Sequence, residues 1–258
     1  MLNRFLPHCY TADDELRELG RATNISLGPE FKVLVWNILK AKRTNWIRDF
    51  KELVIDKDLV LLQEAVLNAP SDYLFQNDER MQWVMARSFR HRTTYVEHGV
   101  KTGCAVVACD RHFYLSPHTE PFSQTQKLLL STQYRIGEST DLLLVINMHA
   151  MNFVGVKKYS DQLDQLSCAL DDHTGPVILA GDFNTWNPSR FVYFLRVAER
   201  ANLREACMQR QTRLAHMNQH LDHVFYRGLS LKSIESLKHY RSSDHAPIVA
   251  SFLVTEDV

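Results

Sequence analysis

An α/β fold is predicted for this chain of 258 residues, because buried-strand patterns alternate with amphipathic-helix patterns along most of its length. The most informative stretch is residues 176–186, which read PVILAGDFNTW. Its apolar run, preceded by Gly175, predicts a buried strand, and Gly181 marks the point where that strand ends. Carboxylates and carboxamides recur at the ends of other predicted strands. The sequence therefore also predicts one site assembled from several strands of a sheet.

The composition is that of an ordinary globular protein, with 45% hydrophobic and 23% charged residues. No apolar run approaches the roughly 18 residues of a transmembrane helix, and residues 1–20 lack the apolar centre of a secretory signal. The five cysteines contain no CxxC pair, and most stand in apolar stretches. They predict reduced, buried thiols and a cytoplasmic location.

The charges balance, with 30 Lys and Arg against 30 Asp and Glu. A balanced charge argues against a non-specific nucleic-acid binder, which usually carries a basic surplus. A local basic groove remains open, and its candidate residues are Arg90, His91, Arg92, Lys101, Lys157, Lys158 and Arg241. No obligate protein partner is evident from the sequence.

Residues 1–30 are predicted to be a lead-in with one short helix that stops at Gly20, and residues 31–258 a single domain. The first half of that domain is predicted to contain a strand at 31–37, a helix from Trp46 to Val54, a strand at 58–64, partial helix within 70–82, strands at 83–86 and 103–109, and an irregular connection at 111–127.

The second half is predicted to begin with a hairpin of residues 128–135 and 142–146 around Gly137. Helices at 159–170 and 189–201 flank the strand at 177–182, and strands at 221–226 and 248–252 complete the chain. Residues 204–220 are polar and receive no assignment.

Polar residues stand at six predicted strand ends or adjoining loops: Asn37, Glu64, Asn147 with His149, Asp182 with Asn184, Asp222, and Asp244 with His245. Several carboxylates in one place cannot all stay ionised unless a cation neutralises them. Oxygen ligands suit magnesium or manganese, whereas histidines beside such a site are better proton carriers than ligands. The strand ends therefore predict a Mg²⁺ site, with Mn²⁺ as the other candidate.

Asp182 and Asn184 are two residues apart, so an extended chain would point both side chains to one side. A turn with an Asx cap explains the same Gly-Asp-x-Asn sequence equally well when it is taken alone.

The motifs VWN at Asn37, LQE at Glu64, NMH at His149, GDFN at Asp182, LDHVF at Asp222 and SDHAP at His245, in this order, resemble the endonuclease/exonuclease/phosphatase superfamily. The similarity extends from about Phe31 to Phe252 and is greatest to its uncharacterised bacterial YafD-like branch. It implies a DNase I-like, four-layered α/β sandwich, in which two central mixed β-sheets are flanked by helices. It also implies Mg²⁺-dependent hydrolysis of a phosphodiester or phosphomonoester by in-line attack of water.

The resemblance also implies a role for each matching residue. Glu64, Asn37 and Asp244 match metal-binding positions, and Asn37 and Asn184 match phosphate-binding ones. Asp182 and Asn184 match the pair that positions the attacking water. His245 matches the histidine that activates water or stabilises the phosphoryl group, with Asp222 orienting it, and His149 matches a candidate general acid. Lys127 matches a lysine found in some branches.

Other hydrolase classes are excluded by missing motifs, since the chain has no GDxH with GNHD, no HExxH, no GxSxG and no GxxxxGK. The substrate remains open among nucleic acid, a nucleotide-like small diester and a phospholipid headgroup. A catalytically silent member of the family that binds a phosphorylated ligand is the alternative from a different functional class.

Overall fold

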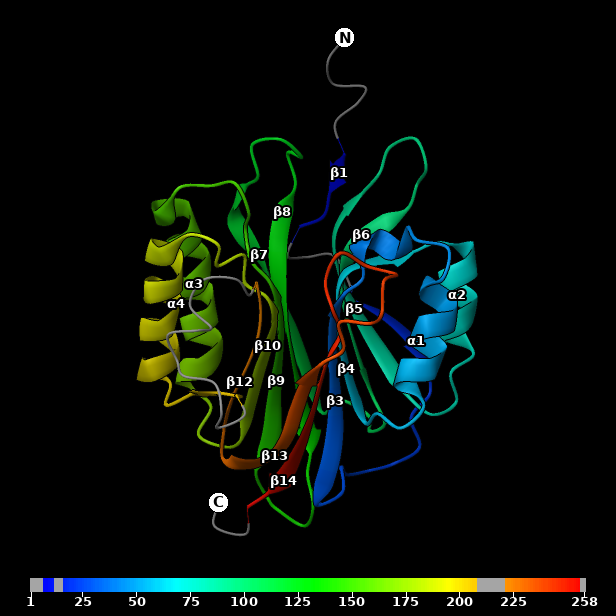
Figure 1. Ribbon diagram of the computed structural model, residues 1–258, viewed down its shortest axis with the longest axis vertical. Coiled ribbons are helices and arrows are strands. Elements are labelled where there is room, and N and C mark those ends of the chain that lie inside the picture. The colour runs from blue at the N-terminus through cyan, green and yellow to red at the C-terminus, as the bar shows by residue number, and fades with distance from the viewer. Residues whose placement is uncertain (1–6, 12–15, 208–220, 256–258) are drawn as a thin grey trace.

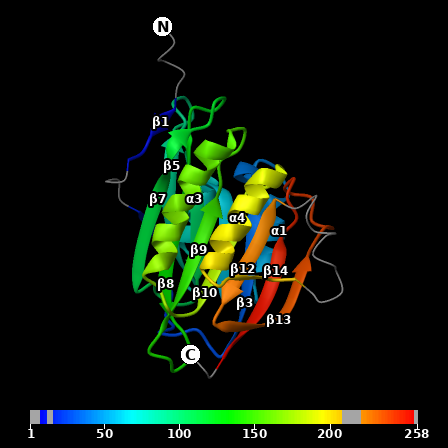
Figure 2. The same cartoon turned by 90° about the vertical axis from the view of Figure 1, so that its left-hand side faces the viewer.

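The computed structural model describes residues 7–11, 16–207 and 221–255. Two β-sheets lie face to face, and helices cover both outer faces (Figure 1). The view turned by 90° shows two of the helices side by side across the outer face of one sheet (Figure 2). One sheet carries α3 (Val156–Asp171) and α4 (Pro188–Arg200), and the other carries α1 (Trp46–Val54) and α2 (Ala69–Gln76). The predicted four-layered α/β sandwich is therefore confirmed.

The first sheet has eight strands in the order β1-β5-β6-β4-β3-β14-β13, with β2 also paired to β5. Its pairs are antiparallel except β3 with β4, which run parallel. The strands are β1 (His8–Cys9), β2 (Arg17–Gly20), β3 (Glu30–Asn37), β4 (Leu59–Leu67), β5 (Gln82–Arg90), β6 (Glu97–Cys104), β13 (Leu229–Ser236) and β14 (Ile248–Val254).

The second sheet has six strands in the order β11-β12-β10-β9-β8-β7, and here only β9 and β10 run parallel. The parallel pair is joined through α3, as a crossover between parallel strands requires. The strands are β7 (Asp110–Thr119), β8 (Gln126–Arg135), β9 (Leu142–His149), β10 (Val177–Asp182), β11 (Arg204–Glu205) and β12 (Asp222–Arg227).

Apolar clusters fill the three interfaces between the four layers. The central core lies between the sheets and includes Val35 and Leu61 from one sheet and Val145 and Ile178 from the other. A second core packs the six-stranded sheet against α3 and α4, and a third packs the eight-stranded sheet against α1 and α2. Because strands β3, β4, β9 and β10 are buried on both faces, their sequences read as nearly continuous apolar runs.

A buried polar link fixes the two sheets relative to each other. Gln63 on β4 donates from Nε2 to Oδ1 of Asn147 on β9 at 2.7 Å, and both side chains are fully buried. Nδ2 of Asn147 donates in turn to the carbonyl of Lys101 at 3.0 Å. Asn147 therefore lies between the sheets and not in a ligand crevice, because its hydrogen-bonding groups are used within the core.

Several sequence-based assignments are wrong. The segment predicted as a helix ending at Gly20 contains the strand β2, which pairs with β5. The connection predicted at 111–127 is mostly strand β7, and β13 had no prediction. Both are edge strands with many exposed polar residues, which hides the alternation expected of a half-buried strand. The unassigned segment contains β11, while its residues 208–220 lie outside the described part.

The cysteines also differ from their prediction. All are unpaired, but only Cys104 is buried, Cys9 is half-buried, and Cys109, Cys168 and Cys207 are exposed. Apolar neighbours in the sequence therefore do not predict whether a cysteine thiol is buried. None of the helices in the described ranges combines the length and hydropathy that a membrane crossing needs.

Candidate functional site

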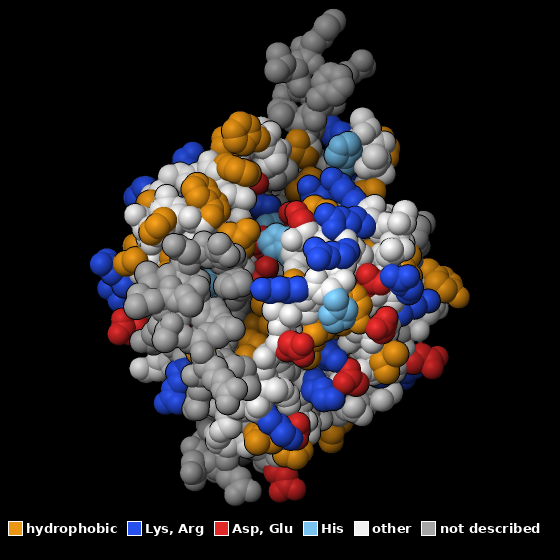
Figure 3. All heavy atoms as spheres, in the orientation of Figure 1, with side chains coloured by type: hydrophobic (Ala, Val, Ile, Leu, Met, Phe, Trp, Pro, Cys, Tyr) orange, Lys and Arg blue, Asp and Glu red, His pale blue; other side chains and the backbone are white. Residues whose placement is uncertain are grey.

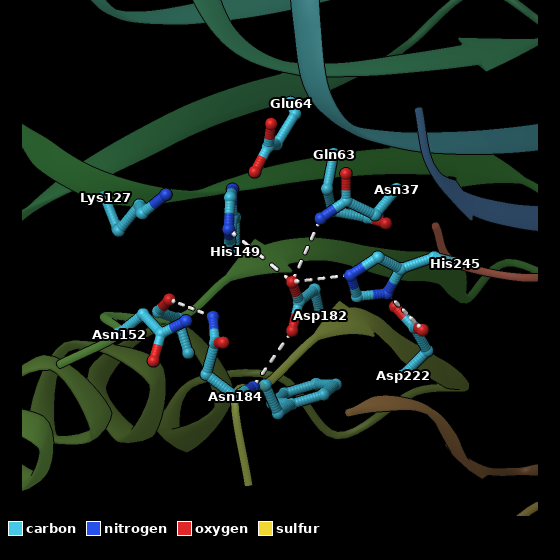
Figure 4. A network of polar contacts seen from close by, with 12 residues as sticks. Asn37, Gln63, Glu64, Lys127, His149, Asn152, Asp182, Asn184, Asp222 and His245 are labelled. Atoms are coloured by element: carbon cyan, nitrogen blue, oxygen red, sulfur yellow. Dashed lines mark hydrogen bonds and ion pairs between the residues drawn. The ribbon is translucent and has the colours of Figure 1, made fainter. Parts of the chain in front are cut away.

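Strand register brings three of the predicted residues together at one end of the six-stranded sheet. Asp182 on β10 is the direct partner of His149 on β9 and of Asp222 on β12. Directly paired residues on neighbouring strands project to the same face of a sheet. Figure 4 shows the resulting network, in which Asp182 lies between the two histidines.

Asp182 is the centre of this network and is almost fully buried. Its Oδ2 accepts a hydrogen bond from Nδ2 of Asn37 at 3.0 Å, and its Oδ1 accepts one from the backbone N–H of Asn184 at 3.0 Å. Nε2 of His149 and Nε2 of His245 lie 3.6 Å and 3.9 Å from Oδ2. Burial, reinforced by the charge of Asp222, raises the pKa of Asp182 to about 7. The carboxyl group can therefore exchange a proton near neutral pH.

His245 and Asp222 form a close pair beside Asp182. Nδ1 of His245 lies 2.6 Å from Oδ2 of Asp222. Burial of the ring lowers its pKa, but the hydrogen bond and charge of Asp222, with smaller contributions from Asp182 and Asp244, outweigh burial and raise the pKa of His245 to about 9. The ring is therefore an imidazolium at neutral pH.

The loop that carries His245 is tied to the end of β3. Nε1 of Trp36 donates to the carbonyl of His245 at 3.0 Å, and Oγ of Ser243 donates to the carbonyl of Asn37 at 2.6 Å. These bonds join the eight-stranded sheet to the loop, and the bond from Asn37 to Asp182 joins it to the six-stranded sheet. Both sheets therefore position the same few side chains.

Asn184 follows the strand in a left-handed backbone conformation, with φ of 49°. The chain is not extended there, so the predicted common direction of Asp182 and Asn184 does not apply. Nδ2 of Asn184 donates to the carbonyl of Ala150 at 2.9 Å. The second amide hydrogen is left for another acceptor.

Glu64 lies within a strand and not at its end. Strand β4 continues to Leu67, and its register with β6 shifts between Leu62 and Ala65. Glu64 has φ of 50° at this irregularity, which turns its carboxylate out of the sheet toward the side of His149 (Figure 4). Nζ of Lys40 lies 3.9 Å from Oε2 of Glu64.

Asp244 is the most peripheral of the predicted residues. Its side chain is exposed, and its Oδ1 lies 3.3 Å from Oγ of Ser243. It contributes to the raised pKa of His245 through its charge.

His149 differs from His245 in its charge. The ring is buried, and burial, followed by the nearby positive charges of Lys127, His245 and Lys40, holds the pKa of His149 well below its ordinary value. A neutral imidazole at this position can donate one hydrogen bond and accept another, but it is not an imidazolium and carries no positive charge at neutral pH.

The donor set fits a hard divalent cation. Asp182, Asp222 and His245 each offer a ligand atom, and these atoms lie within 4.8 Å of one another. Oδ1 of Asp222 is buried without a hydrogen-bond partner among the described residues. Glu64 adds a carboxylate from the facing sheet. Carboxylate oxygens gathered from two sheets suit Mg²⁺ or Mn²⁺ better than Zn²⁺, which prefers nitrogen and sulfur ligands.

Sequence reasoning missed Arg190 in α4, which is fully buried. Its guanidinium donates to the carbonyls of Met151 at 3.2 Å, Asn184 at 3.4 Å and Val154. One side chain thus holds the loops that directly follow His149 at the end of β9 and Asp182 at the end of β10. The arginine is buried together with the apolar residues of this helix, among them Phe191 and Phe194, and sequence alone cannot reveal that burial.

Lys101, predicted as a candidate for a basic groove, is fully buried instead. Its Nζ lies 3.4 Å from the centre of the Phe75 ring, and burial lowers the pKa of Lys101 to about 7. It therefore contributes nothing to a surface groove.

The surface around the site is uneven. A space-filling view shows histidine and acidic side chains on the floor of a hollow, with a group of Lys and Arg side chains on the side of the eight-stranded sheet and hydrophobic side chains on the side of α3 (Figure 3). Exposed aromatic side chains in loops of the six-stranded half include Phe122, Phe153 and Trp186. Nε1 of Trp186 donates to Oδ1 of Asn152 at 2.8 Å.

Solved structures of low sequence identity share this fold. The catalytic domain of human nocturnin with bound sulfate matches 90% of this chain and 97% of its own at 17% identity, with a TM-score of 0.63. A humanized Danio rerio TDP2 matches 87% of this chain and 99% of its own at 16% identity, with a TM-score of 0.63. A complex of D. rerio TDP2 with a single-strand DNA product matches 86% of this chain and 98% of its own at 16% identity, with a TM-score of 0.59.

Sequence relatives are closer. A UPF0294 protein of Vibrio parahaemolyticus is 34% identical over 254 residues, which cover 95% of this chain and 86% of the relative. A UPF0294 protein of Klebsiella pneumoniae is 36% identical over 239 residues, covering 89% and 84%. The model of the Endonuclease/Exonuclease/phosphatase family matches residues 34–245. The chain therefore belongs to the Endonuclease/Exonuclease/phosphatase family.

Proposed function

We propose that this protein is a divalent-metal-dependent phosphoesterase that hydrolyses a phosphodiester or phosphomonoester by in-line attack of water. The observation that carries this proposal is the buried carboxylate of Asp182 beside two imidazoles, one of which, His245, is paired with Asp222 at 2.6 Å. This arrangement supplies a proton acceptor and a fixed positive charge in a water-poor site, as phosphoryl transfer requires.

In the proposed site, Glu64 and Asn37 would hold the cation, with Asp244 as a further ligand candidate, while Asp182, Asp222 and His245 act in proton transfer and charge stabilisation. When bound, Mg²⁺ or Mn²⁺ would neutralise charge on the phosphoryl oxygens and on the leaving oxygen. Asn37 and Asn184 donate hydrogen bonds from their amides to the phosphoryl oxygens, since each presents an NH₂ group at the network.

Asp182 takes a proton from the attacking water as the new P–O bond forms. Its pKa of about 7 makes it a suitable base near neutral pH. His245, held as an imidazolium by Asp222, stabilises the negative charge of the phosphoryl group. The ester P–O bond breaks, and His149 donates a hydrogen bond to the leaving oxygen, which takes its proton from solvent. Because its pKa is lowered, the ring of His149 is neutral at neutral pH. It therefore serves as a hydrogen-bond donor better than as a charged general acid.

Nucleic acid is the first substrate candidate, because the similar TDP2 structure contains a single-strand DNA product. A nucleotide-like diester and a phospholipid headgroup are the others. A silent family member that only binds a phosphorylated ligand would keep the fold without the proton-transfer groups. The pairing of Asp222 with His245 favours the enzyme.

The test combines metal binding with turnover. Purified protein is heated with and without Mg²⁺ or Mn²⁺, and release of p-nitrophenol from bis(p-nitrophenyl) phosphate is followed at neutral pH. Stabilisation by metal together with metal-dependent release supports the proposal. Absence of both favours the silent binding module.

A further inference from the structure

A recess of about 80 Å³ opens beside His149 and Glu64, between the two sheets. Its walls include Lys40, His98 and Lys127, together with the carboxylates of Glu64 and Glu120. In Figure 4, Lys127 reaches toward His149, while His245 and Asp222 lie on the other side of Asp182. The recess thus adjoins the proposed reaction centre on the side away from the His245–Asp222 pair. The proposed function uses only Glu64 and His149 of its lining.

Lys127 supplies positive charge to this recess without a close acceptor. Its side chain is only 18% exposed, and Nζ lies 3.7 Å from Oε2 of Glu120, beyond hydrogen-bonding distance. Glu120 is occupied elsewhere, since it accepts hydrogen bonds from the backbone N–H of Asn152 at 2.7 Å and from Oγ of Ser123 at 3.2 Å. Among the described residues, none accepts a hydrogen bond from the Lys127 ammonium, which is therefore available to a ligand.

Lys40 reaches the recess from an unusual backbone. Leu39, Lys40 and Ala41 all have positive φ, at 49°, 58° and 53°. Three consecutive non-glycine residues in the left-handed region are disfavoured, and such strain tends to occur at functional sites. The backbone N–H of Leu39 donates to Oδ1 of Asn37 at 3.2 Å, which ties this turn to the reaction centre.

The far wall of the recess contains a third nitrogen group. His98 lies on β6, where its ring stacks on Phe89 with centroids 4.5 Å apart. Nδ1 of His98 is buried and has no hydrogen-bond partner in the described structure. Burial, followed by the charge of Lys40, lowers the pKa of His98 to about 4. Lys40 and Lys127 also contribute to the low pKa of His149, which is consistent with a positive potential in the recess.

We propose that the recess binds a second phosphate group of the substrate, next to the scissile ester, with Lys127 and Lys40 contacting its oxygens. Lys127 and Lys40 bring two ammonium groups to the recess, each held only at long range by a carboxylate, at 3.7 Å and 3.9 Å. Lysine binds phosphate as a point charge. The substrate is then a phosphoester that carries another phosphate on the part of the molecule that lies beside His149. This inference rests on the proposed function for its position, but anion binding in the recess can be measured without turnover.

Inorganic phosphate provides the binding test on metal-stripped protein. The imidazole ¹H–¹⁵N signals of His98 report the recess, and those of His245 report the reaction centre. Phosphate is expected to shift the His98 signals until they saturate. Lys127→Met or Lys40→Met should raise the dissociation constant for phosphate by at least about tenfold, the effect of a lost charged hydrogen bond. Lys51→Met, an exposed lysine on α1, is the matched control and should leave the affinity unchanged.

Two substrate pairs identify where the second phosphate comes from. Thymidylyl-thymidine is compared with its 5′-phosphorylated form, and glycerophosphoinositol with its 4-phosphate. The added phosphate should raise kcat/KM about tenfold or more in one pair, and Lys127→Met should remove that gain while Lys51→Met keeps it. The pair that responds distinguishes a nucleic-acid strand from a lipid headgroup.

The proposal is overturned if phosphate shifts only the His245 signals, or if Lys127→Met leaves the phosphate affinity of the recess unchanged. It is also overturned if both parent substrates are hydrolysed and neither gains from the added phosphate. No hydrolysis of any substrate, with phosphate bound at His98, would instead refute the proposed function alone.

Discussion

Nδ1 of His245 lies 2.6 Å from the carboxylate of Asp222, while Nε2 of the same ring faces Asp182 at 3.9 Å. The imidazole therefore connects the carboxylate of Asp222 with that of Asp182, whose pKa is raised to about 7. A carboxylate behind an imidazole fixes the orientation of the ring and stabilises its protonated form. This relationship leads to three predictions about activity and stability.

The first concerns the coupling of the pair. Asp222→Asn and His245→Asn should each lower kcat by about 10²–10⁴-fold, and the double variant should lose little more than the worse single one. Residues that act as a unit show non-additive losses. A double-mutant cycle on kcat measures the coupling. Strictly additive losses in folded variants would show that the two residues act separately.

The pH profile follows from the two shifted groups. Asp182 acts when ionised, so the rate should rise as pH increases through about 7. His245 acts when protonated, so the rate should fall as pH increases through about 9. Asp222→Asn removes the main cause of the raised pKa of His245 and should move the alkaline limb of kcat/KM down by a unit or more. An alkaline limb unmoved by this change would assign it to another group.

The buried carboxylate of Asp182 should lower the stability of the protein at alkaline pH, although it is needed for activity. Its folded-state pKa of about 7 lies above the ordinary 3.8, so its contribution to stability falls as pH rises from about 4 to 7. In metal-stripped protein, Asp182→Asn should therefore melt above wild type at pH 8, and this difference should shrink at pH 5. The same change should lower turnover about 10³-fold, because the base is lost. A variant that keeps a third of wild-type turnover would remove Asp182 from the mechanism.

The sequence predicted much of this site because strand register follows from hydrophobic pattern. Apolar runs ending at His149 and Asp182, and a strand beginning at Asp222, place the three residues at one sheet end once the strands pair. The four-layered sandwich itself came from the family resemblance and not from periodicity. His223, next to Asp222 in sequence, is buried and serves the fold, with Nδ1 2.8 Å from Glu205 and Nε2 2.9 Å from Thr185.

The features that the sequence did not reveal depend on tertiary contacts. The irregularity at Glu64 appears only when β4 pairs with β6, because a local apolar pattern is the same with or without it. The left-handed turn at Lys40 contains no glycine to mark it. Lys101 reads as a surface cation, but packing against Phe75 buries it. Edge strands such as β7 lack the alternation that pattern reading requires.

Glu64 provides a test of metal binding that is separate from the proton-transfer groups. Glu64→Gln keeps the shape of the side chain but removes the charge that holds a hard cation, so the Mg²⁺ concentration for half-maximal activity should rise about tenfold or more. Glu79→Gln, at an exposed loop position, is the control. Activity measured against Mg²⁺ concentration gives both midpoints, and equal midpoints would place Glu64 outside the metal shell.

Arg190 should support the site through the backbone that it holds. Arg190→Met removes donors to three buried or partly buried carbonyls, those of Met151, Val154 and Asn184, and should cost about 2–5 kcal/mol of unfolding free energy. Because the loops after β9 and β10 then lose a shared anchor, kcat should fall even at temperatures where the variant is fully folded. Urea denaturation followed by fluorescence measures the first effect, and kcat at 15 °C the second.

Arg196→Met is the matched control, since Arg196 is exposed on the same helix. Its unfolding free energy should stay within about 0.5 kcal/mol of wild type, the usual range for surface changes. If Arg190→Met were equally harmless, the carbonyls of the two loops would have other donors, and the anchoring role would be wrong. If it lost stability but kept full kcat, the arginine would serve the fold alone, and the positions of Asn184 and His149 would not depend on it.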